Sequence, residues 1–175
     1  VTAVRYRLSR SPRLRLDYGE IRDELARAGR GDAGPVDVAD AVSAIRQRKL
    51  PDPAVIGNAG SFFKNPLVDP AQAQALASRE PGLPAWPAGE RVKLSAAWMI
   101  ERCGWKGYRE GDAGVHAAHA LVLVNHGAAT GAQLLALARR IRDSVHERFG
   151  VRLEAEPVVV GEPDVHGRDC HAGWL

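Results

Sequence analysis

The sequence predicts an α+β fold in which a mixed sheet is flanked by helices, and three observations point to it. The chain has 175 residues, enough for a domain with a hydrophobic core, and 45% of them are hydrophobic. Segments of period two and segments of helical period occur along the chain without repeats or low-complexity tracts. Strands and helices are mixed in order, which is typical of α+β proteins.

The start of the chain is predicted to be extended. Val4, Tyr6 and Leu8 share one face of residues 1–8, and arginines occupy the other face. This alternation is the period-two pattern of a strand. The segment 14–18, LRLDY, is compatible with a continuation of a sheet.

Two helices are expected next. The letters YGEIRDELARAG predict a short helix that ends at Gly29. Apolar residues then recur at helical spacing over 38–45, and Asp37 is the expected N-cap of this second helix. The second helix carries Arg46 and Lys49 at its end, just before a glycine-rich loop.

Shorter elements are expected in the middle of the chain. They are an extended stretch at SFFKNPLV, a helix at PAQAQALASRE, a proline- and glycine-rich connection at 80–90, a helix at KLSAAWMIERCG that stops at Gly104, and a buried strand at HALVLVN. The longest apolar run, ALVLV at 120–124, is too short to cross a bilayer, so we expect no membrane segment.

The best marked element is a helix at 130–149. Thr130 and Gln133 have the spacing of a capping box at its start, and Gly150 closes it. Its apolar stripe consists of Leu134, Leu135, Ala138, Ile141, Val145 and Phe149. A last strand is expected at VRLEAEPVVVG, and a polar tail follows at 162–175.

The net charge of +3 is modest, but arginine outnumbers lysine and gathers in the first stretch of the chain. The arginines there are Arg5, Arg7, Arg10, Arg13 and Arg15. They indicate a solvated face; the alternatives are a nucleic-acid surface or a site for a phosphate-bearing ligand. A nucleic-acid binder would also need exposed stacking aromatics, so we expect no nucleic-acid partner.

The cysteines and histidines indicate neither a disulfide framework nor a metal site. Cys103 and Cys170 form no CxxC pair, which favours a reducing, cytoplasmic setting. His166 and His171 flank Cys170 in the tail, but this single cluster matches no zinc-finger spacing, so no metal is expected. The chain begins at Val1 without an initiator methionine, and we expect its natural start to lie upstream.

The stretch 51–66, PDPAVIGNAGSFFKNP, is unusual for a connection. Gly57 and Gly60 permit backbone angles closed to other residues and let a ligand approach the main chain. This stretch contains none of the known nucleotide and hydrolase signatures, because GxGxxG, the GK[ST] ending of a phosphate loop and GxSxG do not occur within residues 51–66.

Ser61 is the candidate reactive group of this stretch. Phe62 and Phe63 are expected to be buried and to fix the Ser61 hydroxyl, while Lys49 and Lys64 lie near enough in sequence to polarise it. The residues alone favour the plainer alternative of a glycine turn with a capping serine.

The segment KLPDPAVIGNAGSFFKNP resembles the hallmark segment of bacterial UDP-N-acetylenolpyruvoylglucosamine reductases. Three more segments resemble the family, in family order over residues 3–161: LDYGEI, VKLSAAWMIERCGWKGYREGDAGVHAAHALVLVN and VRLEAEPVVVG. The resemblance implies that residues 9–161 are the C-terminal, substrate-binding domain of this flavoprotein. It also implies that residues 1–8 are the last strand of an FAD-binding domain that is otherwise absent.

The resemblance implies an activity as well. In the family NADPH reduces FAD, and the flavin then reduces UDP-N-acetylenolpyruvoylglucosamine to UDP-N-acetylmuramate for peptidoglycan synthesis, which serves cell-wall formation, cell shape and cell division. The FAD would be held by the N-terminal domain, so we expect no cofactor-binding residue here and no activity from the 175 residues alone. A cytoplasmic monomer is implied.

The resemblance assigns roles to seven residues. Ser61 would donate the proton, and Glu156 would stabilise or protonate the enolate-like state. The substrate-binding residues would be Tyr18 over the uridine diphosphate, Lys49 and Asn65 at the diphosphate, Arg46 assisting, and His119. Without the resemblance, Glu156 reads as a charge at a sheet edge.

Two departures from the family pattern stand out. Pro157 and Val158 replace the usual Val-Arg after the glutamate, and His119 replaces a glutamine. These departures affect local contacts and not the reaction. Because the flavin domain is missing, a domain that keeps the fold for interaction without turnover is an alternative. The retention of Ser61 and Glu156, together with a lysine before the loop, argues against it.

Overall fold

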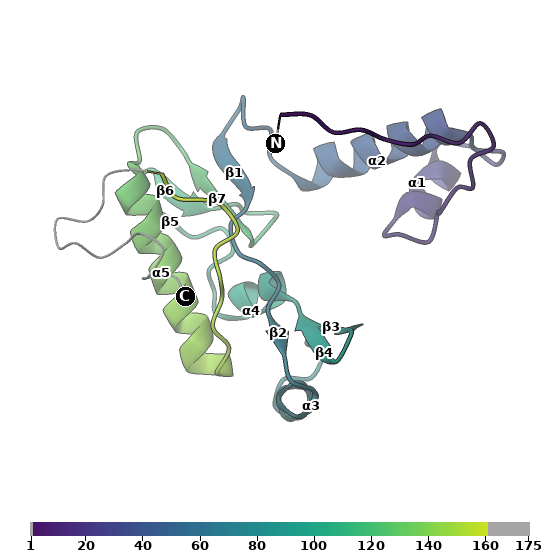
Figure 1. Ribbon diagram of the computed structural model, residues 1–175. Helices are drawn as coiled ribbons and strands as arrows, with labels where there is room; N and C mark the ends of the chain where they lie inside the picture. Colours follow the sequence, from purple (N-terminus) through teal and green to yellow (C-terminus); the bar gives the residue numbers. More distant parts are fainter. Residues whose placement is uncertain (1, 161–175) are drawn as a thin grey trace. The chain divides into compact units, whose positions relative to one another are not determined.

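The structure, a computed structural model, describes residues 2–160. The chain divides into two units, Val1–Leu50 and Pro51–Leu175 (Figure 1). Among residues 2–160, no helix has both the length and the apolar character that crossing a membrane requires.

The first unit contains the two predicted helices, α1 (Ile21–Arg27) and α2 (Pro35–Lys49). They pack through a small apolar core of Ile21, Leu25 and Ala41, bordered by Leu16, Ala33, Val38, Val42 and Ile45. The prediction that Asp37 is the N-cap of α2 is wrong. Gly34 occupies that position, and the Asp37 carboxylate accepts a 2.8 Å hydrogen bond from the Gly34 amide.

No strand forms between residues 2 and 18, so neither the strand predicted at 1–8 nor a continuation of a sheet at 14–18 is present among the described residues. Val4, Tyr6 and Leu8 keep their alternating pattern but are exposed to solvent. An extended segment becomes a strand only when a neighbouring strand takes up its backbone hydrogen bonds, and residues 2–50 provide none.

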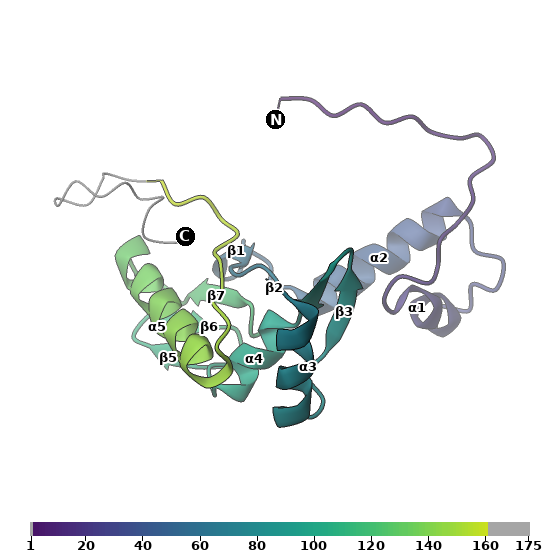
Figure 2. The ribbon, with the colours of Figure 1, turned by 60° about the horizontal axis from the view of Figure 1, so that its bottom comes forward.

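The second unit contains two antiparallel sheets, so the α+β class is confirmed but the expected single mixed sheet is not (Figure 2). The first sheet has the order β1 (Gly57–Ser61), β7 (Val122–Asn125), β6 (Ala113–Val115) and β5 (Arg109–Glu110). The second has the order β2 (Leu67–Val68), β4 (Arg91–Leu94) and β3 (Ala85–Ala88). All pairings between these strands are antiparallel.

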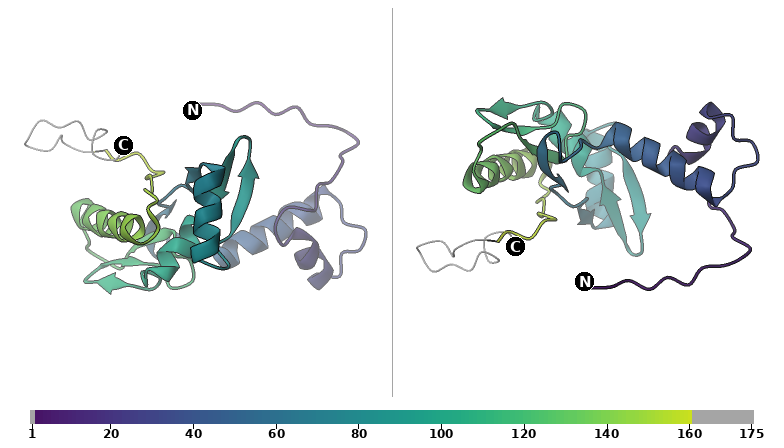
Figure 3. Two further views of the ribbon diagram at one scale, coloured as in Figure 1. Left: turned by 90° about the horizontal axis from the view of Figure 1, so that it is seen from below. Right: turned by 90° about the horizontal axis from the view of Figure 1, so that it is seen from above.

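Several short strands of this unit differ from the prediction. The connection expected at 80–90 contains β3, which forms a hairpin with β4 (Figure 3). Pro87 made the segment look like a break, but a proline is tolerated at the edge of a sheet. The strand expected at 151–161 is reduced to a single bridge between Phe63 and Ala155. Pro157 follows shortly and has no N–H to continue the ladder.

Three helices complete the second unit: α3 (Pro70–Arg79), α4 (Ala96–Arg102) and α5 (Gly131–Phe149). Helix α5 lies against β6, β7 and α4. Its predicted capping box is confirmed, because Thr130 accepts a hydrogen bond from the Gln133 amide and Gln133 accepts one from the Thr130 amide. Gly150 ends the helix at φ 66°. The predicted stripe is buried from Ala138 onward, and Leu137 joins it.

Candidate active site

Ser61 is the last residue of β1, directly after a bulge. Asn58 pairs with Val124 and Ser61 with Val122, so three steps along β1 are matched by two along β7. Gly60 accommodates the extra residue at φ 74°, a conformation that favours glycine. Bulges of this kind re-aim side chains and are frequent beside active sites.

Asn58 fixes the shape of this bulge. Its side-chain oxygen accepts a 3.0 Å hydrogen bond from the Gly60 amide. Its side-chain nitrogen donates to the carbonyls of Ile56 at 2.9 Å and Pro51 at 3.3 Å. The asparagine therefore holds both the start of the loop and the glycine that precedes Ser61.

The two phenylalanines after Ser61 are buried, as predicted. Phe62 is 8% exposed and Phe63 is 1% exposed, and their rings meet edge to face at 5.1 Å between centroids. The Phe62 amide also donates a 2.8 Å hydrogen bond to the Leu121 carbonyl. Ser61 is thus followed by an anchor that involves both backbone and side chains.

Glu156 lies on the segment that pairs with the residues after Ser61. Its amide donates a 2.9 Å hydrogen bond to the Phe62 carbonyl, and the Lys64 amide donates a 2.9 Å bond to the Glu154 carbonyl. Lys64 was expected to polarise Ser61, but its ammonium lies 3.5 Å from the Glu154 carboxylate. Glu156 itself is exposed.

Asn65 and His119 are held by contacts with the same unit. The Asn65 side-chain oxygen accepts a 3.0 Å hydrogen bond from the Ala96 amide at the start of α4. Its side-chain nitrogen has no hydrogen-bond partner among residues 2–160. His119 is half-buried in the turn before β7, where its carbonyl accepts a 3.0 Å bond from the Val122 amide. His119 therefore precedes β7 at the end where Ser61 pairs with Val122.

The other three predicted site residues lie in the first unit. Tyr18 is 84% exposed, and Arg46 is in the last turn of α2. The Lys49 ammonium donates a 2.7 Å hydrogen bond to the Glu20 carboxylate. This hydrogen bond, together with the positive charge of Lys49, lowers the pKa of Glu20. This pair is not predicted from the sequence, because no spacing pattern connects residues so far apart.

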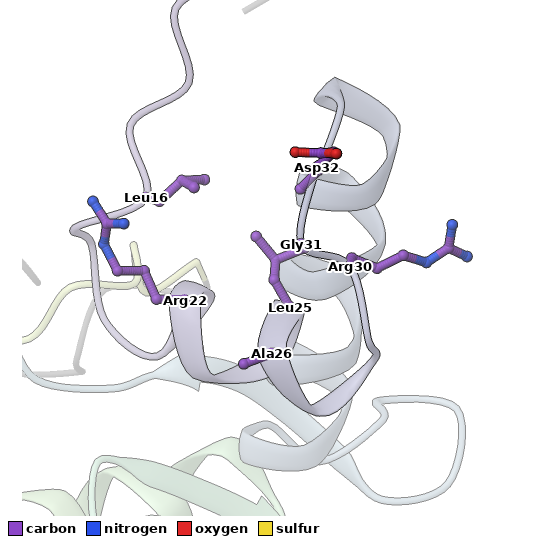
Figure 4. A pocket seen from close by; sticks show the side chains of 8 residues that line it. Leu16, Arg22, Leu25, Ala26, Arg30, Gly31 and Asp32 are labelled. Atoms are coloured by element: carbon purple, nitrogen blue, oxygen red, sulfur yellow. The ribbon is translucent and has the colours of Figure 1, made fainter.

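A hollow of about 590 Å³ is also present in the first unit, but it is a poor candidate site (Figure 4). It is lined by Leu16, Arg22, Leu25, Ala26, Arg30, Gly31, Asp32 and Ala33. The two arginines point away from each other, and each is paired with a carboxylate: Arg22 with Asp17 at 2.6 Å and Arg30 with Asp37 at 3.1 Å. None of the seven predicted site residues lines it.

Residues 2–160 contain no cluster of three or more histidine, cysteine, aspartate or glutamate side chains that could hold a metal ion. His166, Cys170 and His171, the metal-like group of the tail, lie outside the described residues.

Comparison with known protein families gives one match that spans most of the second unit. Residues 52–160 match the family model of the UDP-N-acetylenolpyruvoylglucosamine reductase C-terminal domain. The matched region contains Ser61, Asn65, His119 and Glu156.

Curated relatives extend the similarity to the first unit. The chain is 60% identical over 161 residues to the UDP-N-acetylenolpyruvoylglucosamine reductase of Chromobacterium violaceum. The aligned residues make up 91% of this chain and 47% of the relative. It is 56% identical over 158 residues to the reductase of Pseudomonas aeruginosa, with 90% and 47% covered. The chain thus spans about half the length of these relatives. A solved structure of the Thermus caldophilus reductase aligns with 69% of this chain and 32% of its own, at 30% identity and a TM-score of 0.42.

Proposed function

Because the chain belongs to the UDP-N-acetylenolpyruvoylglucosamine reductase family, we propose that it is the part of the reductase that binds the substrate and donates the proton. The observation that supports this most directly is the hydrogen bond from Glu156 to Phe62, the residue after Ser61. This backbone hydrogen bond holds the segment of Glu156 beside the segment of Ser61, although the two candidate catalytic residues are distant in sequence.

The cofactor is assigned to the part of the relatives that this chain does not span. The hollow beside Leu16 and Leu25 does not fit FAD, because it is an open depression whose arginines are already paired with carboxylates. When bound by the N-terminal domain and reduced by NADPH, FAD would supply the hydride. We expect the 175 residues alone to retain no FAD after desalting, and a sample that stays yellow would contradict this.

Ser61 is proposed to supply the proton. Addition of hydride to one carbon of an enol ether leaves the adjacent carbon carbanion-like, and so strongly basic that a positioned hydroxyl can protonate it. The bulge at Gly60 and the buried phenylalanines would hold the hydroxyl in place. Glu156 would stabilise or protonate the enolate-like state. The residue is exposed, so a ligand can reach its carboxylate.

The remaining residues are proposed to bind the uridine diphosphate of UDP-N-acetylenolpyruvoylglucosamine. Lys49 suits a phosphate as a mobile point charge, with Arg46 assisting. Asn65 retains two N–H donors after its oxygen has capped α4. Tyr18 would cover the nucleotide, and His119 would contact the substrate at the end of β7 near Ser61.

We propose further that the protein acts in the cytoplasm as a monomer in peptidoglycan synthesis, with no nucleic-acid or membrane partner. The arginine-rich start is the feature that a nucleic-acid binder would use. The phenylalanines beside Ser61 are buried and offer no stacking surface, so the exposed aromatic ring within this start is that of Tyr6 alone. Any affinity of the arginines for nucleic acid should then be nonspecific and fall steeply with salt.

The test uses the complete reductase, meaning these residues joined to the N-terminal half that the curated relatives have. Ser61→Ala should leave reduction of the flavin by NADPH near normal. It should slow reoxidation of the flavin by the enolpyruvyl substrate by a factor on the order of 10² to 10⁴, with substrate affinity little changed. Ser61→Cys, which keeps a transferable proton, should recover part of the rate.

Ser78→Ala is the matched control, since Ser78 lies on the exposed face of α3 and its hydroxyl donates only to the Gln74 carbonyl. It should behave like the unmutated enzyme. If Ser61→Ala reoxidises as fast as that control, Ser61 is only a turn residue and the proposal fails.

A further inference from the structure

The segment that carries Tyr18 is held to the two helices by an ion pair on each side of the tyrosine. Before it, Asp17 pairs with Arg22 of α1 at 2.6 Å. After it, Glu20 pairs with Lys49 of α2 at 2.7 Å. Between Tyr18 and Glu20 lies Gly19, at φ 60°. The tyrosine itself remains exposed.

The second of these ion pairs involves the ammonium of Lys49, which is the group proposed above to bind the diphosphate. About half of the Lys49 side chain and 43% of the Glu20 side chain are exposed, so an incoming anion can reach both. Arg48 also pairs with Glu20, but only at 3.8 Å, and its guanidinium forms two hydrogen bonds with Glu24, at 2.8 and 3.1 Å. Lys49 is therefore the hydrogen-bonded partner of Glu20.

We propose that Glu20 competes with the diphosphate of a nucleotide ligand for Lys49. When the ligand binds, Lys49 leaves Glu20 for the diphosphate, and one of the two ion pairs that hold the Tyr18 segment is broken. The proposal rests on the role of Lys49 in the proposed function. It makes Glu20 a positioning residue that sets both the affinity of this subsite and the freedom of the tyrosine.

The balance of charges favours the exchange. An exposed carboxylate–ammonium pair contributes little stability, because solvent screens it and both side chains lose freedom. A diphosphate offers more negative charge and several acceptors to the same ammonium. Once it binds, the Glu20 carboxylate faces a group of its own sign and is repelled. Gly19 allows the backbone between Glu20 and Tyr18 to change direction at little cost.

The competition operates at neutral pH because Glu20 stays ionised there. The hydrogen bond from Lys49 keeps the pKa of Glu20 below its usual range. Gln at this position would keep the shape and a weak acceptor but would remove the charge. Glu24 is the matched control, because it lies one turn further along, pairs with Arg48 and Arg27, and makes no contact with Lys49 among the described residues.

The experiment measures the dissociation constant of UDP by calorimetry on the complete reductase. The variants are Glu20→Gln, Lys49→Ala, the double variant and Glu24→Gln, each checked for thermal stability. Glu20→Gln should tighten UDP binding roughly two- to fivefold. The gain should vanish in the Lys49→Ala background, and Glu24→Gln should bind like the unmutated enzyme. Uridine, which lacks the diphosphate, should bind Glu20→Gln and the unmutated enzyme equally.

Unchanged or weaker UDP binding by Glu20→Gln would overturn the exchange, and so would an equal gain with and without Lys49. The proposed function fails separately. If Lys49→Ala leaves UDP affinity unchanged, Lys49 does not bind the diphosphate. The role proposed for Lys49 and the exchange with Glu20 are then both wrong. If Lys49→Ala weakens UDP binding while Glu20→Gln has no effect, only the exchange is wrong.

Discussion

The amide of Glu156 donates a 2.9 Å hydrogen bond to the carbonyl of Phe62, while the Phe62 amide donates a 2.8 Å hydrogen bond to the carbonyl of Leu121. The backbone of Phe62 is therefore held from both sides, by segments far apart in the sequence. Since Ser61 directly precedes Phe62, its position depends on both neighbours. The position of Ser61 is consequently a product of the fold of the second unit and not of the glycine-rich loop alone.

Glu156 should be required for the half-reaction with the enolpyruvyl substrate. In the complete reductase, Glu156→Gln removes the charge but keeps the backbone bond to Phe62, so the fold should be unaffected. We expect flavin reoxidation to slow by about 10²-fold and flavin reduction by NADPH to stay normal, as measured by stopped-flow absorbance.

Glu154→Gln is the control for this prediction. Glu154 lies two residues earlier, is exposed like Glu156 and pairs only loosely with Lys64. Its substitution should leave both half-reactions unchanged. Equal rates for the two variants would remove Glu156 from the catalytic set.

Asn65 should have two separable roles. Its oxygen caps α4 through Ala96, and its nitrogen is proposed to donate to the diphosphate. Asn65→Asp keeps the acceptor but loses the donors and adds negative charge, so we expect near-normal stability and weaker UDP binding. Asn65→Ala should also lose about 1 kcal/mol of unfolding free energy, measured in urea.

Ser95→Ala separates the two effects. Ser95 caps the same helix by accepting a 3.2 Å hydrogen bond from the Trp98 amide. Its loss should cost about 1 kcal/mol of stability without weakening UDP binding. If Asn65→Asp binds UDP as tightly as Ser95→Ala does, Asn65 is only a cap.

The elements that the sequence predicts correctly are those whose signals are local. Helix α5 has its cap residues, apolar stripe and terminal glycine within or next to its own span, and the structure confirms the caps and the stripe from Ala138 onward. The burial of Phe62 and Phe63 likewise follows from their place beside a tight turn. Such features depend on neighbours in sequence, which is what a pattern records.

The features that were missed depend on distant partners. Strands β5 and β6 are two and three residues long, too short to show a period, and exist because β7 pairs with β6. The segment 1–8 has the pattern of a strand but no neighbouring strand in residues 2–50. The Lys49–Glu20 pair and the bond between Glu156 and Phe62 also join residues that no spacing rule connects. The roles proposed for Ser61 and Glu156 came from resemblance to a family and not from pattern.

The pair of helices in the first unit should lose stability in acid. The pKa of Glu20 is lowered by its hydrogen bond from Lys49, and that of Glu24 by its hydrogen bond from Arg48. Since both folded-state values lie below the unfolded value of about 4.3, the stabilisation is complete above that pH. It is lost as the pH falls through the lower folded-state values.

Amide hydrogen exchange of α2, followed by NMR between about pH 7 and pH 3 and corrected for intrinsic rates, measures this loss. A variant with both Glu20→Gln and Glu24→Gln has no charge to protonate at these positions, so its protection in α2 should depend less on pH. The same pH dependence in both proteins would show that these ion pairs do not stabilise the helices.

Gly60 should be needed for the position of Ser61 more than for the space around it. A Cβ at Gly60 would meet no atom within 4 Å, so the cost of Gly60→Ala comes from the backbone conformation at φ 74°. That cost is about 1–2 kcal/mol for a residue with a side chain, and the strand can avoid it by relaxing the bulge. Relaxation would change the register between Asn58 and Ser61 and turn the hydroxyl away from its present direction. We therefore expect Gly60→Ala to lose up to this amount of unfolding free energy in urea, and also to slow flavin reoxidation by the substrate in the complete reductase.

Gly131→Ala is the control. Gly131 is the first residue of α5, its φ is not positive, and a Cβ there would also meet no atom within 4 Å. Alanine at this position should therefore be neutral or stabilising and should leave the rate of reoxidation unchanged. A Gly60→Ala enzyme that is less stable but reoxidises at the normal rate would show that the bulge serves the sheet and not the serine.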